Sequence, residues 1–205
     1  LIGINSNVFG QTTITLIPNS TEGKDAFIRD YSSTTNFGSS AEFIICAWTY
    51  SGNPMIVRSF IDFDFSSITT GATITSANLS LYNDPNSQTS NGEHSQLDGS
   101  NAMFVERVIS SWNEQTITWN NQPTVTTQNQ VSVPASSSIH QNYIINVTAL
   151  VQDIIDNSAN SFGFMLKLQT EQHYRSVVFA SSDVADTTLR PKLVVTYIEN
   201  DIECL

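Results

Sequence analysis

Residues 75–82 read TSANLSLY, and their alternation is typical of a β-strand with one buried face. Small or apolar side chains alternate there with polar ones, the apolar set being Ala77, Leu79 and Leu81. Because successive side chains of a strand point to opposite faces, these three share one side. Residues 57–65, VRSFIDFDF, alternate in a similar way. A dominant period of two predicts an all-β chain.

The same pattern continues along most of the chain and predicts ten or eleven strands. Besides the two already quoted, strands are expected at 12–17, 25–30, 42–50, 102–109, 115–119, 142–147, 162–168, 175–180 and 192–198. Clusters of Gly, Asn, Ser and Pro separate them, as turns require. The economical fold is one antiparallel β-sandwich of jelly-roll type over residues 11–198.

Two segments depart from the strand pattern. In TALVQDIIDNS the apolar residues fall at helical spacing, which predicts one short α-helix at about 148–156. Residues 83–101 show no regular pattern and are longer than most connections between strands. Loops of this length tend to be either functional or disordered.

The composition argues against several kinds of partner. Only 13% of the residues are charged, and the net charge is −11. Nucleic acids and anionic membrane surfaces attract cationic patches, so neither is an expected partner. No apolar run approaches the roughly 18 residues that span a bilayer. Polarity carried by Ser, Thr, Asn and Gln is common in secreted β-domains, so we expect an extracellular or cell-surface location in a bacterium.

The ends of the chain and its two cysteines leave alternatives open. Residues 1–10 are interpreted as a signal-peptide remnant or N-terminal extension, and 199–205 as the start of a linker or tail. Cys46 and Cys204 either form a disulfide or lie apart, one in a buried strand and the other in the tail. A disulfide would close a loop of about 160 residues and stabilise the fold by about 4–5 kcal/mol.

Several motifs in a fixed order suggest a family. They are DAFIRDYSSTTNFGSS at 25–40, an Arg-led strand at 58–64, GATITSANLSLY at 71–82, WNEQTITWNNQP at 112–123, NVTALVQ at 146–152 and PKLVVTY at 191–197. This order resembles the DNRLRE-type domain, a secreted β-sandwich also grouped with carbohydrate-binding modules. The resemblance implies the fold more strongly than the function. The loop 83–101 and CAWTY at 46–50 are not part of the family's common pattern.

The WNEQTITWNNQP motif contains two of the three tryptophans. Trp119 alternates with Ile117 in an expected strand, and we predict that it belongs to the core. Trp112 lies at a strand end and is expected to pack a corner.

Motifs of known catalytic classes are absent from the sequence. There is no GxSxG, HExxH, P-loop or Gly-rich dinucleotide turn. The three histidines share no ligand spacing, and nineteen acidic residues give no basis for choosing a catalytic pair. We therefore expect a protein that is not an enzyme, with a polysaccharide lyase or hydrolase as the less favoured alternative.

A structural calcium ion is a candidate cofactor, because Ca²⁺ prefers oxygen ligands and the chain is rich in them. Asp25 at the start of an expected strand is one candidate ligand. Asp84, Asn86 and Asp98 in the long loop are others. The alternative is that these residues cap turns or face solvent.

Four basic residues fall inside expected strands although the chain has only eight Lys and Arg. They are Arg29, Arg58, Arg107 and Lys167. On an exposed sheet face they would converge on the carboxylates of an acidic polysaccharide. The alternative is cross-strand pairing with Asp62, Asp64 or Glu106.

Two aromatic residues mark a candidate ligand face. Trp48 and Tyr50 are two apart, so they share one side of their strand, and they precede the turn SGNP. We predict that they line a ligand face together with Arg58 on the next strand, and that replacing both rings removes binding with little loss of stability. The alternative is that Trp48 extends a core row formed by Ile44 and Cys46.

Three functions remain in contention. The leading one is a non-catalytic carbohydrate-binding or adhesion module whose partner is a polysaccharide or cell-surface glycan. The second is a structural or assembly domain that contacts neighbouring domains or subunits of a surface protein or filament. The third is the lyase or hydrolase.

Overall fold

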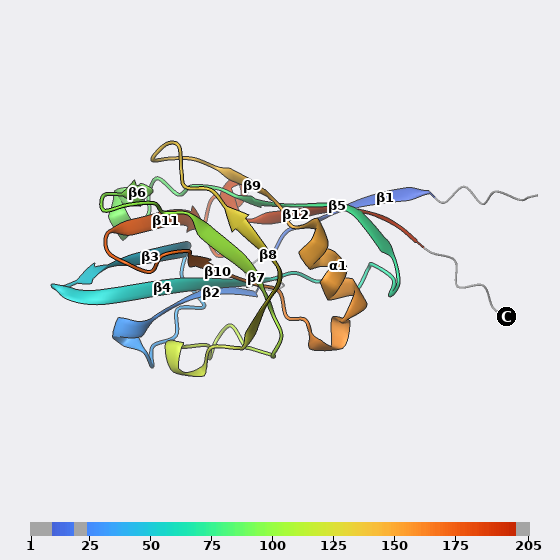
Figure 1. Cartoon of the computed structure of the whole chain (residues 1–205), viewed down its shortest axis with the longest axis horizontal. Coiled ribbons are helices and arrows are strands. Elements are labelled where there is room, and N and C mark those ends of the chain that lie inside the picture. Colours follow the sequence, from blue (N-terminus) through green and yellow to red (C-terminus); the bar gives the residue numbers. More distant parts are fainter. Residues whose placement is uncertain (1–9, 19–23, 200–205) are drawn as a thin grey trace, which may run out of the picture.

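The computed structural model describes residues 10–18 and 24–199. Its strands pair antiparallel in two sheets, and a single α-helix accompanies them in this part of the chain (Figure 1). The fold is the all-β sandwich that the sequence predicts. Ten of the expected strands and the helix occur close to their predicted positions.

The smaller sheet has four strands in the order β1-β12-β5-β9. Their bounds are β1 (Gln11–Leu16), β12 (Lys192–Ile198), β5 (Thr73–Leu81) and β9 (Tyr143–Asn146). The apolar row of TSANLSLY is fully buried in β5. Gln11 is the register partner of Ile198, so the chain enters β1 and leaves β12 at the same end of the sheet.

The larger sheet has eight strands, in the order β6-β11-β3-β4-β10-β7-β8, with β2 also paired to β4. Their bounds are β2 (Lys24–Arg29), β3 (Glu42–Tyr50), β4 (Asn53–Asp62), β6 (Ser95–Gln96), β7 (Met103–Val108), β8 (Val125–Val133), β10 (Phe164–Leu168) and β11 (Arg175–Ala180). The rows β1-β12-β5-β9 and β4-β10-β7-β8 together have the strand order of a jelly roll.

The main core lies between the two sheets. It joins apolar residues of β5 and β12 with others from β3, β7, β10 and β11. Helix α1 (Thr148–Asp156) adds its apolar face, Leu150, Val151, Ile154 and Ile155, to the same cluster. Burial of this apolar area is the main term that stabilises the fold.

Two smaller apolar clusters lie on the larger sheet. One contains Ala26, Ile28, Phe60, Val108, Ile117 and Met165. The other contains Phe27, Ile44, Cys46, Met55, Val57 and Val178, with Phe37 and Trp48 packed against it. The second cluster forms the floor of the site described below.

Three local features differ from what the sequence pattern indicates. Residues 115–119 form no strand, because the side chains of Asn113 and Asn121 bond to nearby backbone and favour turns, and a short 3-10 helix follows at Trp119–Asn121. Strand β8 was not expected. The loop 83–101 is packed, since His94 and Asn101 are buried in it, and it holds β6 and the 3-10 helix Thr89–Gly92.

Some predictions fall outside the described residues. They concern residues 1–9 and 200–205, and with them the signal-peptide remnant, the tail and Cys204. Cys46 is fully buried in β3, and burial raises the pKa of its thiol to about 12. No helix in the described part of the chain is long and apolar enough to cross a bilayer.

Candidate functional site

A pocket of about 330 Å³ opens on the larger sheet where β3 ends, and we call it the aromatic pocket. Trp48 and Tyr50 line it, as their shared parity predicts. Its floor is the apolar cluster around Cys46 and Val57. Tyr50 is 49% exposed and Trp48 is half-buried, so solvent reaches both rings.

Arg29 is the basic residue that the structure brings to these rings. It ends β2, and its guanidinium carbon lies 4.5 Å from the ring centroid of Phe37 and 5.3 Å from that of Tyr50. Among the described residues its side chain has no hydrogen-bond or ion-pair partner, and its Nε is buried. The two rings therefore orient the guanidinium while its polar edge remains available.

The long loop forms one wall of the aromatic pocket through Gln88, Thr89 and Ser90. Glu42 of β3 anchors it by accepting hydrogen bonds from the Ser87 hydroxyl and from both the backbone N–H and the hydroxyl of Thr89. The segment CAWTY and the loop 83–101 thus meet at this pocket.

The alternative interpretation of Trp48 is also partly right. Its ring packs against the cluster that contains Ile44 and Cys46, and it meets Tyr174 edge-on with ring centroids 4.9 Å apart. Trp48 therefore extends a core row and lines the pocket at the same time.

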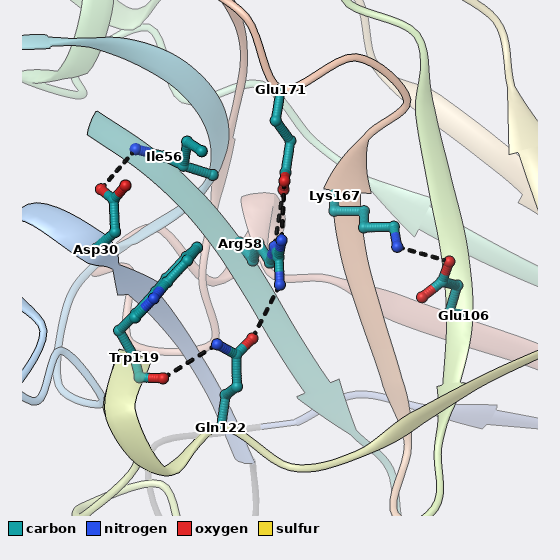
Figure 2. A network of polar contacts seen from close by, with 8 residues as sticks. All are labelled: Asp30, Ile56, Arg58, Glu106, Trp119, Gln122, Lys167 and Glu171. Atoms are coloured by element: carbon teal, nitrogen blue, oxygen red, sulfur yellow. Dashed lines mark hydrogen bonds and ion pairs between the residues drawn. The ribbon is translucent and has the colours of Figure 1, made fainter. Parts of the chain in front are cut away.

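Arg58 does not share the pocket with Trp48 and Tyr50. Met55 and Val57 of β4 line the pocket, and Arg58 alternates with them, so it projects from the other face of the strand. There it binds Glu171 through two hydrogen bonds of 2.7 and 2.8 Å and donates a third to Gln122 (Figure 2). Hydrogen bonding to Glu171 raises the pKa of Arg58.

Trp119 belongs to this second group and also packs against the first of the two smaller apolar clusters, so its predicted core position is partly right. Its ring is half-buried and lies over the Arg58 guanidinium, 4.8 Å from carbon to centroid (Figure 2). Its carbonyl accepts a hydrogen bond from Gln122, which completes the network. Trp112 packs a corner as expected, with its Nε1 donating to the carbonyl of Phe162.

Two further basic residues of the strands, Lys167 and Arg107, also bond to other residues of this chain. Lys167 forms an ion pair of 3.0 Å with Glu106, one of the alternatives that the sequence left open (Figure 2). Arg107 is 6% exposed and donates to Asn160 and Ser161. The prediction of an exposed basic face formed by four strand residues is therefore wrong, because burial and internal partners occupy three of them.

The candidate metal ligands separate into two groups. Asp25 lies in a cluster with Glu114 and Asp183. Asp84 accepts the backbone N–H of Asn86 in a turn, as the capping alternative predicts. Asp98 is exposed, and within the described residues neither loop aspartate belongs to a group of three metal-ligating side chains.

Several contributors to these sites were missed by sequence reasoning. Tyr31 packs against Tyr50 with ring centroids 5.1 Å apart, and Tyr174 supports Trp48. Tyr31 lies in the 3-10 helix Asp30–Ser32 just before β3 and Tyr174 just before β11, and no local pattern marks either as a contact of these rings. Glu114 and Asp183 lie in loops, where an acidic residue looks like any solvated turn residue.

Comparisons with known proteins agree with this architecture. The family model described as carbohydrate-binding module family 96 matches residues 17–197. No curated protein matches the chain significantly. A solved structure of naturally occurring empty particles of cowpea mosaic virus aligns with 98% of this chain and 91% of its own at 10% identity, but its TM-score of 0.24 supports no conclusion. With the sandwich fold and the match over most of its length, the chain belongs to carbohydrate-binding module family 96.

Proposed function

We propose that the chain is a non-catalytic binding module that holds an acidic polysaccharide in the aromatic pocket. The observation that carries this proposal is the meeting of Trp48, Tyr50 and Arg29 with the long loop at one accessible pocket. Membership of carbohydrate-binding module family 96 supports a carbohydrate ligand. The guanidinium of Arg29 in the pocket supports a ligand that carries acidic groups.

Each part of the pocket suits a different part of such a ligand. The exposed rings of Trp48 and Tyr50 offer apolar faces on which sugar rings stack, while their polar atoms stay in contact with water. The guanidinium of Arg29 presents a planar set of donors that matches a carboxylate. Thr89 and Ser90 of the long loop line the same pocket and add polar groups to its wall.

The acids of the pocket support a binding role over a catalytic one. Glycoside cleavage by the common mechanisms needs two carboxyl groups on either side of the scissile bond. Among the described residues Glu42 is the one acid that lines the pocket, and hydrogen bonds from Ser87 and Thr89 hold it against the loop. The part of the chain that the structure describes therefore brings no pair of carboxylates to this pocket.

The net charge of −11 opposes the approach of a polyanion at long range. Recognition of an acidic polymer must then come from short-range contacts with Arg29. This is why the test compares acidic with neutral polymers of otherwise similar backbone.

Affinity electrophoresis and calorimetry with a panel of acidic and neutral polysaccharides test the proposal. We expect retention by an acidic polymer, loss of retention in Tyr50→Ala, and loss of the preference for acid in Arg29→Gln. Tyr82→Ala is the matched control, because Tyr82 also lies near a cation, Lys192, but does not line the pocket. Equal retention of all three variants would contradict the proposed site.

A structural or assembly domain is the second candidate, and the internal pairing of Arg58 and Lys167 favours it. Absence of binding to every polymer of the panel would support this role. A fall in polymer viscosity on incubation would reveal an enzyme instead.

We infer an extracellular or cell-surface location from the low content of charged residues and the abundance of Ser, Thr and Asn. Fractionation of the producing cells tests it, and recovery of the protein with the cytosol would contradict it.

A further inference from the structure

Three carboxylates from distant parts of the chain meet at one place outside the aromatic pocket. Asp25 lies in β2, Glu114 in the loop after β7, and Asp183 in the loop after β11. Each places an oxygen atom within 4.8 Å of the other two. Within the described residues no other group of three metal-ligating side chains is this close.

The charges of Lys24 and Arg190 act on Glu114 and Asp183, but among the described residues neither forms an ion pair with a member of the cluster. The ion pairs of the described residues involve Asp62, Glu106 and Glu171, so none includes a member of the cluster. Asp25 is 1% exposed, and burial raises the pKa of its carboxyl to about 7. Burial also raises the pKa of Glu114 and of Asp183, although the charge of Arg190 acts on Asp183 in the opposite direction. Unpaired carboxylates in contact disfavour the folded state.

A buried hydroxyl points to the same place. The backbone N–H of Ser182 donates to Oδ2 of Asp25 at 2.6 Å. Its hydroxyl lies against the same carboxylate and lowers the pKa of Asp25, yet its geometry makes no hydrogen bond with any described residue. Ser182 is 1% exposed, and a buried hydroxyl without a partner is uncommon in native structures. Ligation of a cation would account for its orientation.

The backbone around Glu114 is held by a short turn at residues 36–38. The side-chain amide of Asn36 donates to the carbonyl oxygens of Glu114 and Ile117, at 2.7 and 2.8 Å. The backbone of Gly38 passes so close to Glu114 that a Cβ atom there would overlap its carbonyl oxygen. The backbone N–H of Asp25 donates to Oε1 of Glu114 at 2.9 Å. These contacts hold two of the three carboxylates in a fixed relation.

We propose that Asp25, Glu114, Asp183 and the Ser182 hydroxyl bind one calcium ion. Calcium takes six to eight oxygen ligands at about 2.3–2.6 Å, so two oxygens on one ion are at most about 5 Å apart. The spacing of the cluster meets this limit. An all-oxygen donor set disfavours zinc, which prefers nitrogen and sulfur, and Glu114 and Asp183 are only half-buried, which leaves an approach for the ion and its waters.

Calorimetric titration of the EDTA-treated chain with CaCl₂ tests the proposal directly. We expect one ion per chain and a Tm that rises by ~5–10 °C when calcium is present at ~100 times its Kd. MgCl₂ should bind more weakly, because Mg²⁺ demands shorter and more regular coordination. The readout needs no carbohydrate, so its failure and the failure of the proposed function are separate results.

Two variants and a control locate the ion. Asp183→Asn and Glu114→Gln should each lower calcium affinity by at least ~10-fold. In EDTA, Asp183→Asn should raise Tm above that of the parent chain, because it removes one of three carboxylates that lie close together without an ion-pair partner. Asp98→Asn, which removes the same charge from an exposed loop position, should bind calcium like the parent.

The sign of the effect in EDTA separates a metal site from a purely structural cluster. If the cluster served only to hydrogen-bond its neighbours, both variants would lower Tm equally with and without calcium. That result, or an absence of calcium binding by the parent chain, would overturn the proposal. Loss of calcium binding in Asp98→Asn alone would also overturn it, since the ion would then lie in the long loop.

Discussion

Trp48 and Tyr50 line the same pocket, but the structure assigns them different shares in stability. Trp48 packs against the cluster around Ile44 and against Tyr174, so Trp48→Ala should lower the free energy of unfolding by about 2 kcal/mol. Tyr50 is 49% exposed, and Tyr50→Ala should cost about 0.5 kcal/mol or less. Urea denaturation checks both values. The structure therefore predicts that Tyr50 alone is dispensable for stability, whereas the sequence predicted this of both rings.

The same two variants should weaken polysaccharide binding to a similar degree, by roughly tenfold each, since each removes one stacking ring. Calorimetry at a temperature where Trp48→Ala remains folded separates the two effects. Parent-like affinity in a folded Tyr50→Ala would place the ligand elsewhere.

His94 gives the long loop a pH-dependent attachment. Its Nδ1 accepts the backbone N–H of Val178 at 3.0 Å, and its Nε2 lies 2.8 Å from the carbonyl of Gln141, so the neutral ring satisfies both. Burial lowers the pKa of His94 below its ordinary value of 6.5, with the charge of His140 acting in the same direction. Tyr143 and Phe179 complete its surroundings.

A histidine whose pKa is lowered by folding binds fewer protons in the folded state than in the unfolded state. Its contribution to stability is therefore complete above pH 6.5 and is lost as the pH falls toward the lower pKa of the folded protein. His94→Asn retains an acceptor for Val178 but cannot titrate. Urea midpoints between pH 7.5 and 5 should converge for the parent and this variant as the pH falls. Parallel curves would show that His94 does not control the pH response.

The location of Arg58 shows how far single residues can be predicted from sequence. Parity alone correctly placed Trp48 and Tyr50 on one side of β3. Whether a residue of the next strand shares that side depends on the hairpin register. The turn pairs Tyr50 with Asn53, which sets Met55 and Val57 beside the pocket and turns Arg58 away. The two-residue turn Ser51-Gly52 sets this register. The side of the sheet on which Arg58 lies can be predicted only after the residue pairs across the hairpin have been assigned.

At the scale of elements, the turn that contains Gly38 couples β2 to the loop of Glu114. Gly38→Ala should lower the free energy of unfolding by ~1–3 kcal/mol, because the new methyl group displaces the Glu114 backbone. The displacement should also weaken calcium binding. Gly10→Ala is the control, since a methyl group at Gly10 meets no neighbour among the described residues. Thermal melts with EDTA and with calcium measure both effects, and equal stability of the two variants would contradict the predicted clash.

Strands were predicted correctly where one buried face gives the sequence a regular alternation of apolar and polar residues. They were missed or wrongly predicted where that alternation is weak or misleading. Strand β5 is buried on its apolar face, so its alternation is regular. Strand β8 is an edge strand with exposed central residues, and a register irregularity interrupts its pairing with β7, so its sequence VTTQNQVSV carries little alternation. The segment 115–119 alternates like a strand, but side-chain bonds from Asn113 and Asn121 to the backbone prevail over that pattern.

At the scale of the whole molecule, the fold and the candidate sites differ in what determines them. The sandwich follows from a hydrophobic period repeated in many strands, which is why motif order and alternation suffice to predict it. The aromatic pocket combines β2, β3, β4 and the long loop, and the carboxylate cluster combines three distant segments. Such sites depend on long-range packing, so the sequence supplied candidate residues but not their grouping.

The pairing of Gln11 with Ile198 has a mechanical consequence. Tension applied through the two ends of the described chain, at Gly10 and Glu199, would load the hydrogen bonds between β1 and β12 one after another, like opening a zipper. Tension between Gly10 and Pro191 would load the same ladder in parallel, because these residues lie at opposite ends of it. Single-molecule pulling should therefore record a lower rupture force for the first pair of handles than for the second, and equal forces would show that another element yields first.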